Sequence, residues 1–429
     1  MNNIIILGAG LAGIASGYKL KQQDINFEIF EKENEYGGLC RKLKIGNFIF
    51  DRFPHFSFTK DEKIKKMFID SAGEYYSHIP NPSNYYKGLW LGNPAQNNLY
   101  PLEQEEKIKI IEGFKTKPNI ENPKNYQEWL DASFGYYFTK EFSGKYTKKY
   151  WTTEAKNMSV DWVGSRVIKS NLEEIEYGAW NKDCKSKYYA SEMRYPKYGG
   201  FQNFFDSWTP KENIKLNHNL IRWNAQKKEL LFDNGYKTHY NNIISTLPLT
   251  YIANIIEDIP NNIKQAASKL CNTSGYTVSI GLKGKLNIPY LWFYVYDENI
   301  LFPRVYISTF KSPYNAPYEY SSLQVEIPCS KYRQIDLNNN EIVEHTINKL
   351  VDMNIFDYKQ VEFAQLDYHQ YANILFTLDT EVNKKIVLDW LKENNIYTAG
   401  RYGKWEYYWT DQTINSGFDA ANNIAQKYK

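Results

Sequence analysis

Three observations predict an α/β protein that combines a Rossmann-like nucleotide-binding domain with a helical insertion and an antiparallel-sheet domain. An apolar run over residues 4–7 leads directly into a GxGxxG motif. Apolar residues then recur at helical spacing within residues 103–181. Several β-rich runs follow between residues 275 and 327. With 429 residues, the chain is long enough for two or three domains.

The three glycines of the motif have the spacing of a turn that closes on a diphosphate. A side chain at Gly8 would block the tight turn, one at Gly10 would meet the pyrophosphate, and one at Gly13 would hold the next helix off the sheet. That helix, expected over residues 11–22, points its N-terminal amides at the phosphates. The segment therefore predicts a dinucleotide site; the alternative is a glycine-rich turn that binds nothing.

A second strand, expected over residues 26–30, ends at Glu31, eighteen residues after the last glycine of the motif. A carboxylate at about this offset meets a ribose hydroxyl and argues against a 2′-phosphate there. Gly37, Gly38 and Arg41 follow, an addition that resembles the extended diphosphate motif of FAD enzymes. The cofactor residues assigned from these segments are Gly8, Gly10, Gly13, Glu31, Gly38 and Arg41, to which we add Leu220 at the end of an expected strand.

The remaining elements suggest a discontinuous organisation. We expect strands over residues 47–51, 214–220, 221–224, 229–232, 236–240, 242–247, 276–282, 291–295, 304–309, 322–327 and 396–400, and helices over 61–70, 105–114, 126–134, 340–353, 383–392 and 411–426. We assign residues 1–78, 195–250 and 393–429 to the FAD-binding domain, 103–194 to the helical insertion, and 79–102 with 251–392 to the antiparallel-sheet substrate domain.

Composition excludes several classes of function. The 52 basic and 49 acidic residues are well mixed and give a net charge of +3, so nucleic acid is not an expected partner. The four cysteines are far apart without a CxxC, and the six histidines lack metal-ligand spacing, so neither a disulfide framework nor a metal is predicted. No run reaches the ~18 apolar residues of a spanning helix. The chain begins with a strand instead of a cleavable signal, and we expect a cytoplasmic location.

Aromatic residues are abundant, with 37 Tyr and 11 Trp. Such rings stack on sugars, bases and flavins, although codon bias would give the same composition. Composition alone therefore favours carbohydrate chemistry only weakly.

Five segments together resemble UDP-galactopyranose mutase and its relatives, within the broader protoporphyrinogen-oxidase and amine-oxidase group of flavoproteins. They are the first 60 residues, YPL at 100–102, KYTKKYW at 145–151, the arginine of FPRVYI at 302–307, and AGRYGKWEYYWTDQ at 399–412. The resemblance implies an FAD enzyme that interconverts the pyranose and furanose forms of a nucleotide sugar with no net oxidation.

The resemblance also implies roles for individual residues. His55 matches the histidine against the isoalloxazine, and Arg401 matches an arginine that contacts the FAD. Arg304 matches the arginine beside the flavin and the substrate phosphates. Tyr407 matches a tyrosine on the diphosphate, whereas Tyr146, Trp151 and Arg166 lie in or after the segment that leads into a lid. We thus expect Arg304, His55 and Arg166 to be catalytic, and Tyr146, Trp151, Arg166, Arg304 and Tyr407 to bind substrate.

Each assignment has a structural alternative. Arg304 and Arg401 would also suit surface ion pairs, Trp151 and Tyr407 would also suit the core, and a loop histidine such as His55 is often structural. The chain also departs from the family pattern. In the family, the loop that contains Pro54 and His55 here has a second histidine, which Phe58 replaces. The lid of the family has two arginines; Arg166 matches the first, and Lys169-Ser170 stands where the second is expected.

As a hypothesis, N5 of the reduced FAD attacks the anomeric carbon and expels the nucleotide diphosphate, the sugar opens and recloses, and the product serves cell-surface polysaccharide synthesis. NADPH or NADH is the expected reductant. The principal alternative is an FAD-dependent oxidase or desaturase of the amine-oxidase type, and a non-catalytic cofactor-binding module is a third. The sequence leaves a homodimer open.

Overall fold

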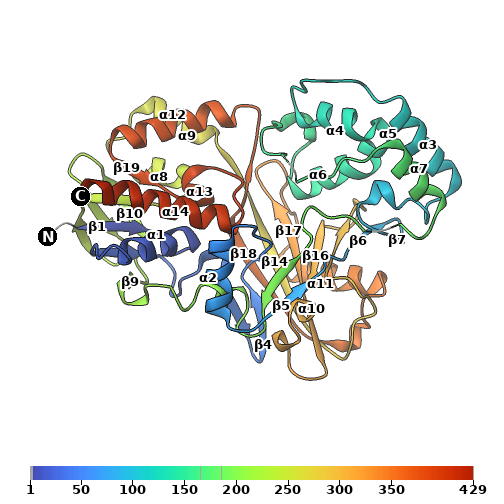
Figure 1. Cartoon of the computed structure of the whole chain (residues 1–429), viewed down its shortest axis with the longest axis horizontal. Helices are drawn as coiled ribbons and strands as arrows, with labels where there is room; N and C mark the ends of the chain where they lie inside the picture. The colour runs from blue at the N-terminus through green and yellow to red at the C-terminus, as the bar shows by residue number, and fades with distance from the viewer. Residues whose placement is uncertain (1–2, 165, 185, 429) are drawn as a thin grey trace.

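The computed structural model describes residues 3–164, 166–184 and 186–428. Figure 1 shows an α/β lobe that carries both termini, a helical lobe at the opposite end, and a large sheet between and below them. The predicted fold class is confirmed: a Rossmann-like domain is joined to a helical insertion and to a sheet whose neighbouring strands are mostly antiparallel.

The α/β lobe is built on a five-stranded sheet in which every neighbouring pair is parallel. Its order is β19-β13-β1-β2-β9, so β1 lies at the centre with β2 and β13 beside it. The strands are β1 (Ile4–Leu7), β2 (Phe27–Phe30), β9 (Ile214–Lys215), β13 (Asn242–Ser245) and β19 (Ile396–Thr398). Both β1 and β13 are almost wholly buried, as expected for a parallel sheet covered by helices.

Helices α1 (Leu11–Lys21) and α14 (Thr410–Ala425) run side by side over this sheet (Figure 1). Small residues allow the close approach, because a Cβ built on Gly417 would lie 2.5 Å from the carbonyl oxygen of Ala12. Ser16 Oγ donates a hydrogen bond to the Gly417 carbonyl at 3.0 Å. The last helix of the chain therefore packs against the first one.

Smaller elements surround this lobe. They are the sheet of β10 (Leu220–Asn224), β11 (Glu229–Phe232) and β12 (Lys237–His239), the hairpin of β3 (Lys42–Ile45) and β4 (Phe48–Asp51), the pair β5 (Tyr75–His78) and β8 (Met193–Pro196), and helices α2 (Glu62–Ala72), α8 (Leu249–Ile255), α9 (Asn261–Lys269), α12 (Thr380–Glu393) and α13 (Gly400–Lys404).

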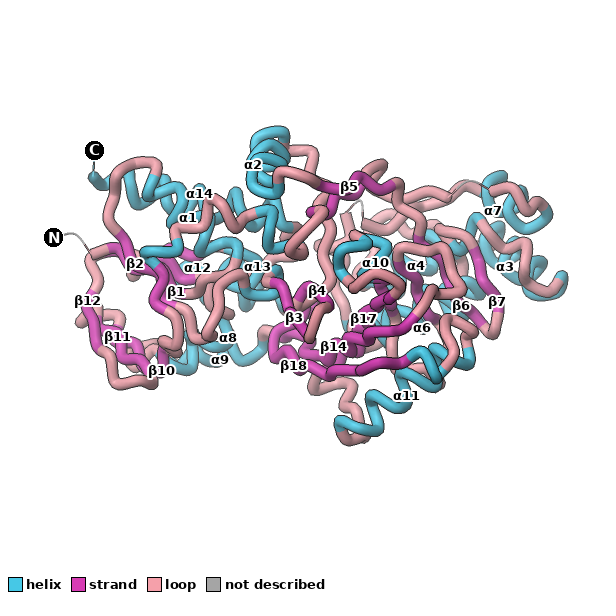
Figure 2. Tube along the Cα trace, turned by 90° about the horizontal axis from the view of Figure 1, so that it is seen from below, coloured by secondary structure: helices cyan, strands magenta, loops and turns pink. Residues whose placement is uncertain are grey.

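The second sheet has seven strands in the order β18-β14-β17-β16-β15-β6-β7, all antiparallel except the β15–β6 pair. Its strands are β6 (Pro82–Tyr86), β7 (Leu89–Leu91), β14 (Cys271–Lys283), β15 (Trp292–Val295), β16 (Arg304–Ile307), β17 (Tyr320–Cys329) and β18 (Val361–Leu375). Apolar residues of helix α11 (Asn339–Asp352) belong to the core of this sheet, and Figure 2 shows the helix beside the sheet from below. Helix α10 (Ser308–Lys311) follows β16 directly.

The helical lobe consists of α3 (Gln104–Lys115), α4 (Tyr126–Phe134), α5 (Tyr136–Phe138), α6 (Gly144–Tyr150) and α7 (Leu172–Trp180). Aromatic side chains fill its interior, where Phe138 and Phe142 stack with their ring centroids 4.6 Å apart. One continuous apolar cluster joins this interior to that of the α/β lobe.

Several sequence expectations need correction. The expected strand over 214–220 forms only β9, because the chain turns before Leu220 starts β10. The run over 304–309 leaves the sheet after Ile307 and becomes helix α10. Helix α9 and most of α8 and α12 lie within residues 251–392, which we assigned to the antiparallel-sheet domain. These helices pack with one another and beside β10 and β19. The domain limits therefore stay a prediction.

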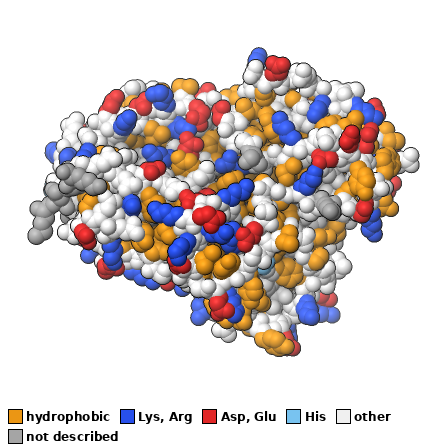
Figure 3. All heavy atoms as spheres, in the orientation of Figure 1, with side chains coloured by type: hydrophobic (Ala, Val, Ile, Leu, Met, Phe, Trp, Pro, Cys, Tyr) orange, Lys and Arg blue, Asp and Glu red, His pale blue; other side chains and the backbone are white. Residues whose placement is uncertain are grey.

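Charged side chains of both signs are interspersed over the face seen in Figure 3. Among the described residues, no helix is long and apolar enough to span a membrane.

Candidate active site

Two neighbouring cavities lie against the antiparallel sheet, the larger one facing the parallel sheet and the smaller one facing the helical lobe. The larger one has a volume of about 740 Å³ and begins at the carboxyl ends of β1, β2 and β13. The smaller one has a volume of about 260 Å³ and reaches into the helical lobe. Five side chains line both of them: Tyr150, Tyr188, Tyr189, Arg304 and Tyr407. The site is therefore one elongated cavity with two compartments, and its first end has the position where open α/β sheets bind ligands.

The glycine loop has the geometry that the motif predicts. Gly8 has a φ of +94°, and a Cβ there would lie 2.4 Å from Thr246 Oγ1. A Cβ on Gly13 would lie only 1.9 Å from the Gly8 carbonyl oxygen, so this glycine lets α1 approach the loop. A Cβ on Gly10 would meet nothing within 4 Å, because it would point into the open cavity. The space beside Gly10 is thus available to a diphosphate.

Glu31 lies at the end of β2 in the cavity wall and is largely buried. The amide of Ala9 donates to its Oε2 at 2.7 Å, and the amide of Glu33 donates to its Oε1 at 3.0 Å. These two backbone donors hold the carboxylate, and each oxygen keeps a lone pair for a ribose hydroxyl.

The second glycine pair packs against the first loop. The amide of Gly37 donates to the Ala9 carbonyl at 2.8 Å, and Gly38 lines the cavity. Arg41, in contrast, is not among the lining residues, because its guanidinium turns toward Glu33, with Nη1 3.6 Å from Oε2. Its Nη1 is buried and donates no hydrogen bond in the structure. A role for Arg41 in cofactor binding stays a prediction.

Leu220 marks the far end of the larger cavity, next to an aromatic cluster. It lies among Phe30, His218 and Phe232, whose rings pack with centroids 4.6 to 5.5 Å apart. An apolar, aromatic end beyond the ribose carboxylate suits a flat adenine ring.

His55 lies on the loop after β4, with its ring in the wall of the larger cavity. Its Nδ1 is 2.6 Å from the Phe53 carbonyl oxygen, and its Nε2 is 3.6 Å from Cys40 Sγ. Burial lowers the pKa of this imidazole to about 4, although Asp51 and the Phe53 carbonyl act in the opposite direction. The ring is therefore neutral at physiological pH.

Arg304 projects from β16 opposite Glu326 of β17, its cross-strand partner. Its Nη2 and Nε donate to Glu326 Oε2 at 2.6 and 2.9 Å. Glu326 is almost completely buried, and burial raises the pKa of its carboxyl although Arg304 lies beside it. This ion pair holds a guanidinium at the junction of the two compartments, so the surface alternative for Arg304 is wrong.

A chain of polar contacts connects Arg304 to Arg401. Arg304 Nη2 donates to the hydroxyl of Tyr150 at 3.2 Å, and Asn373 Nδ2 donates to the same hydroxyl at 3.1 Å. Arg401 Nη1 then donates to Asn373 Oδ1 at 2.9 Å. The sequence analysis did not predict Tyr150, Asn373 and Glu326 as site residues. Tyr150 lies within the KYTKKYW segment, and no local motif marks Asn373 or Glu326.

The smaller cavity has an aromatic lining. Tyr146 stacks on Tyr150 at 5.5 Å and 12°, and Trp151 packs edge-on against Tyr407 at 5.3 Å. Tyr146, Trp151 and Tyr407 all line this compartment, so the structure brings these three residues together, and their role in substrate binding stays a prediction. Trp151 and Tyr407 also belong to the apolar core or pack on it, so the two interpretations of these rings are compatible.

Arg166 covers one side of the same compartment. Its Nη2 donates to the Tyr407 carbonyl at 2.6 Å, and its guanidinium lies over the rings of Tyr407 and Trp409 at 4.7 and 4.8 Å. Its Nε is buried and has no hydrogen-bond partner. The structure thus places Arg166 at the predicted site, with its Nε–H available to donate to a ligand.

The two departures from the family pattern lie in different places. Phe58 lines the larger cavity and packs against Tyr189 and Trp409 with centroids 5.4 and 4.9 Å away. Lys169 lies outside both compartments, with its Nζ 4.9 Å from the centre of the Trp129 ring. The first departure therefore changes the cavity wall, and the second does not.

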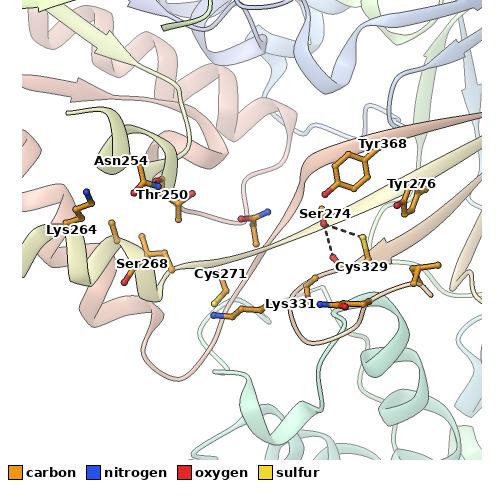
Figure 4. A pocket seen from close by; sticks show the side chains of 16 residues that line it. Thr250, Asn254, Lys264, Ser268, Cys271, Ser274, Tyr276, Cys329, Lys331 and Tyr368 are labelled. Atoms are coloured by element: carbon orange, nitrogen blue, oxygen red, sulfur yellow. Dashed lines mark hydrogen bonds between the residues drawn. The ribbon is translucent and has the colours of Figure 1, made fainter. Parts of the chain in front are cut away.

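A separate groove of about 690 Å³ lies between α8, α9 and the ends of β14 and β17. Figure 4 shows Thr250 and Asn254 on one side and Ser274, Cys329 and Tyr368 on the other. It contains none of the predicted site residues. All four cysteines are free thiols, and the described residues contain no group of three side chains suited to hold a metal.

Comparison with known proteins identifies the family. Residues 11–425 match the family described as flavin containing amine oxidoreductase. The dTDP-fucopyranose mutase of Escherichia coli is 23% identical over 238 residues, which cover 53% of this chain and 57% of that protein. The chain thus aligns with little more than half the length of this relative. The mitochondrial protoporphyrinogen oxidase of Nicotiana tabacum is 34% identical over 70 residues, 16% of this chain and 14% of that protein.

Solved structures share the fold. A crystal structure of reduced UDP-galactopyranose mutase superposes with a TM-score of 0.93 at 22% identity, over 100% of this chain and 96% of the other. The cyclohexylamine oxidase of Brevibacterium oxydans superposes with a TM-score of 0.69 at 13% identity, over 100% and 99% of the two chains. The fold implied by the sequence resemblance is therefore confirmed.

Proposed function

The chain belongs to the flavin containing amine oxidoreductase family, and on that premise we propose that it is an FAD-dependent mutase that interconverts the pyranose and furanose forms of a nucleotide sugar. Because proteins of this family contain a flavin, we expect a flavin cofactor in this chain. Gly8, Gly10 and Glu31 fit FAD, because Gly8 allows the tight turn, Gly10 leaves room for the pyrophosphate, and the Glu31 carboxylate would meet a ribose. The UDP-galactopyranose mutase fold and the dTDP-fucopyranose mutase relative support the mutase class.

One observation carries the proposal: guanidinium groups cluster where the two compartments meet. Arg304 lines both compartments, Arg166 lines the smaller one, and Arg401 lines the larger one. A diphosphate at this junction would place a base among the aromatic rings of the helical lobe and a sugar toward the flavin. Charge-assisted, bidentate donors are well suited to hold phosphate oxygens.

The reduced flavin would supply the nucleophile that displaces the nucleoside diphosphate from the anomeric carbon. In this proposal, Arg304 and Arg166 stabilise the negative charge on the departing diphosphate, and Tyr407 holds it near the sugar. The aromatic wall of Phe58, Tyr189 and Trp409 orients the sugar and excludes water. The return of the same diphosphate makes the reaction an isomerisation, so no oxidant is consumed.

An oxidase or desaturase is the competing function, and the similarity to a cyclohexylamine oxidase fold makes it worth testing. The arginines favour the mutase, because pockets for small apolar substrates are mostly apolar and rarely hold several guanidinium groups. NADPH or NADH stays the expected reductant. The cytoplasmic location, the homodimer and the role in polysaccharide synthesis also stay predictions.

The test uses the purified protein with FAD and a panel that includes UDP-galactose and dTDP-fucose. Under anaerobic conditions with dithionite, we expect one of these sugars to be converted to an isomer of the same mass, separated by chromatography. With oxidised flavin, we expect conversion to stop. Oxygen consumption with any amine or polyene substrate, together with no sugar isomerisation, would instead establish the oxidase class.

A further inference from the structure

The ring of His55 makes a hydrogen bond at each nitrogen. A carbonyl oxygen only accepts hydrogen bonds, so the 2.6 Å contact with Phe53 requires a proton on Nδ1. The neutral ring carries one proton, which leaves Nε2 as an acceptor. The side-chain partner of Nε2 is Cys40 Sγ, at 3.6 Å. The geometry therefore makes the thiol of Cys40 the donor.

We propose that Cys40 is a positioning residue for His55: its S–H donates to Nε2 of the Nδ1–H tautomer and holds the imidazole in its orientation toward the cofactor. The inference rests on the proposed function, because only a bound flavin makes the orientation of this ring important.

The position of Cys40 in the fold supports this role. It ends the short turn that begins with Gly38, and its amide donates to the Gly37 carbonyl at 3.0 Å. Cys40 and His55 both line the larger cavity, and Cys40 is buried. The thiol therefore connects the glycine-rich turn to the Pro-His loop, two segments that are not adjacent in sequence.

The electrostatic surroundings keep both partners neutral. Burial and the nearby Asp51 carboxylate raise the pKa of the Cys40 thiol to about 12, so its proton is retained. The charged groups that face His55 are Asp51, Arg401 and Lys311. The Lys311 ammonium donates to Asp51 Oδ2 at 2.8 Å, so the charge of Asp51 is largely compensated. A neutral S–H···N contact is thus the form that this environment favours.

The first test is the nitrogen NMR spectrum of histidine-labelled protein, which has only six histidines to resolve. We expect His55 to show a protonated Nδ1 and an unprotonated, hydrogen-bonded Nε2. In Cys40→Ala, the Nε2 resonance should move to the position of an acceptor without this donor. Cys40→Ser should keep the Nε2 resonance at the position of a hydrogen-bonded acceptor, because a hydroxyl also donates. An Nε2–H tautomer in the unaltered protein, or identical ring resonances in Cys40→Ala, would overturn the proposal.

The second test uses the flavin-loaded enzyme with Cys184→Ala as the matched control, because Cys184 lies outside both compartments. We expect Cys40→Ala to shift the flavin absorbance and to lower kcat by about tenfold at unchanged KM. Cys40→Ser should recover part of both, and Cys184→Ala should alter neither. If the enzyme isomerises no sugar, the proposed function fails, whereas the NMR result still decides the role of Cys40.

Discussion

The two ends of the elongated cavity are built in different ways. At the nucleotide end, one local stretch supplies Gly8, Gly10 and Glu31, and the backbone shapes the space. At the junction with the helical lobe, the side chains Arg166, Arg304 and Tyr407 come from distant segments and shape the space themselves. The first end depends on the absence of side chains, and the second depends on their exact contacts.

This difference predicts how each end responds to mutation. A new side chain at the nucleotide end removes space for the cofactor, so we expect a loss of affinity without a loss of fold. Removal of a side chain at the junction leaves a buried partner without its contact, so we expect function and stability to change together.

The largest effect is expected from Arg304→Ala. Glu326 would remain buried without its partner, which costs about 3–5 kcal/mol of unfolding free energy. Loss of the guanidinium should also lower isomerase turnover by about 100- to 1,000-fold. Denaturant unfolding and product chromatography measure the two effects. The double variant Arg304→Met with Glu326→Met should recover stability without activity.

Arg222 provides the matched control for that experiment. It forms an ion pair with Glu257 at 3.6 Å, but both side chains are nearly half exposed. Arg222→Ala should cost less than about 1 kcal/mol, since exposed pairs contribute little. Equal losses in the two single variants would contradict the buried junction.

At the nucleotide end, Gly10→Ala should weaken FAD binding by about 10- to 100-fold, because its Cβ enters the diphosphate space. The free protein should unfold at nearly the same denaturant concentration as the unaltered one. Gly113→Ala is the control, since its Cβ meets only Tyr137 at 3.4 Å, away from the cavity. Unchanged FAD affinity in Gly10→Ala, measured by titration of flavin fluorescence, would place the cofactor elsewhere.

A smaller effect is expected from Arg166→Ala, which removes the donor to the Tyr407 carbonyl and the cover over Trp409. We expect the KM for the nucleotide sugar to rise by about tenfold, as for the loss of one charged hydrogen bond. Lys169→Ala should leave KM unchanged, because its ammonium lies over Trp129 outside the cavity. Steady-state kinetics compare the two variants, and equal KM values would remove Arg166 from the substrate site.

A further prediction concerns the pH dependence of stability. Burial lowers the pKa of His369 to about 4 from its ordinary value of 6.5, as it does for His55. Between these values the unfolded chain binds more protons than the folded one, so the unfolding free energy falls as the pH falls from 6.5 toward 4. Each histidine contributes up to about 1.4 kcal/mol per pH unit.

Denaturant unfolding at pH 6.5 and pH 5 measures this slope. His369→Gln should make it shallower, because one of the two buried imidazoles is removed. His239→Gln should leave it unchanged, since the side chain of His239 is mostly exposed. A slope that is equal in all three proteins would contradict the neutral, buried state of His369.

The nucleotide end was predictable from sequence because its geometry is encoded within about 40 consecutive residues. The turn requires residues without a side chain at fixed positions, so its glycines recur at a regular spacing. The apolar run before them marks the strand. Glu31 follows from a fixed offset. Arg41 shows the limit of such motifs, because its pairing with Glu33 depends on side-chain conformation.

The junction was predictable only through family resemblance. Tyr150 and Asn373 join Arg304 to Arg401, but they lie 223 residues apart and no spacing connects them. Strand β18 was missed because polar residues interrupt the apolar ones throughout its sequence, VEFAQLDYHQYANIL, and its first half is only partly buried. Its pairing with β14 along almost its whole length, a tertiary effect, makes it a strand.

An anaerobic comparison of one preparation with oxidised and with reduced flavin tests the proposed mutase activity most directly. We expect a yellow protein that binds FAD, interconverts two isomers of a nucleotide sugar only after reduction, and leaves the flavin reduced when the reaction ends. A protein that binds no FAD, or one that converts the sugar equally well with oxidised flavin, would contradict this proposal.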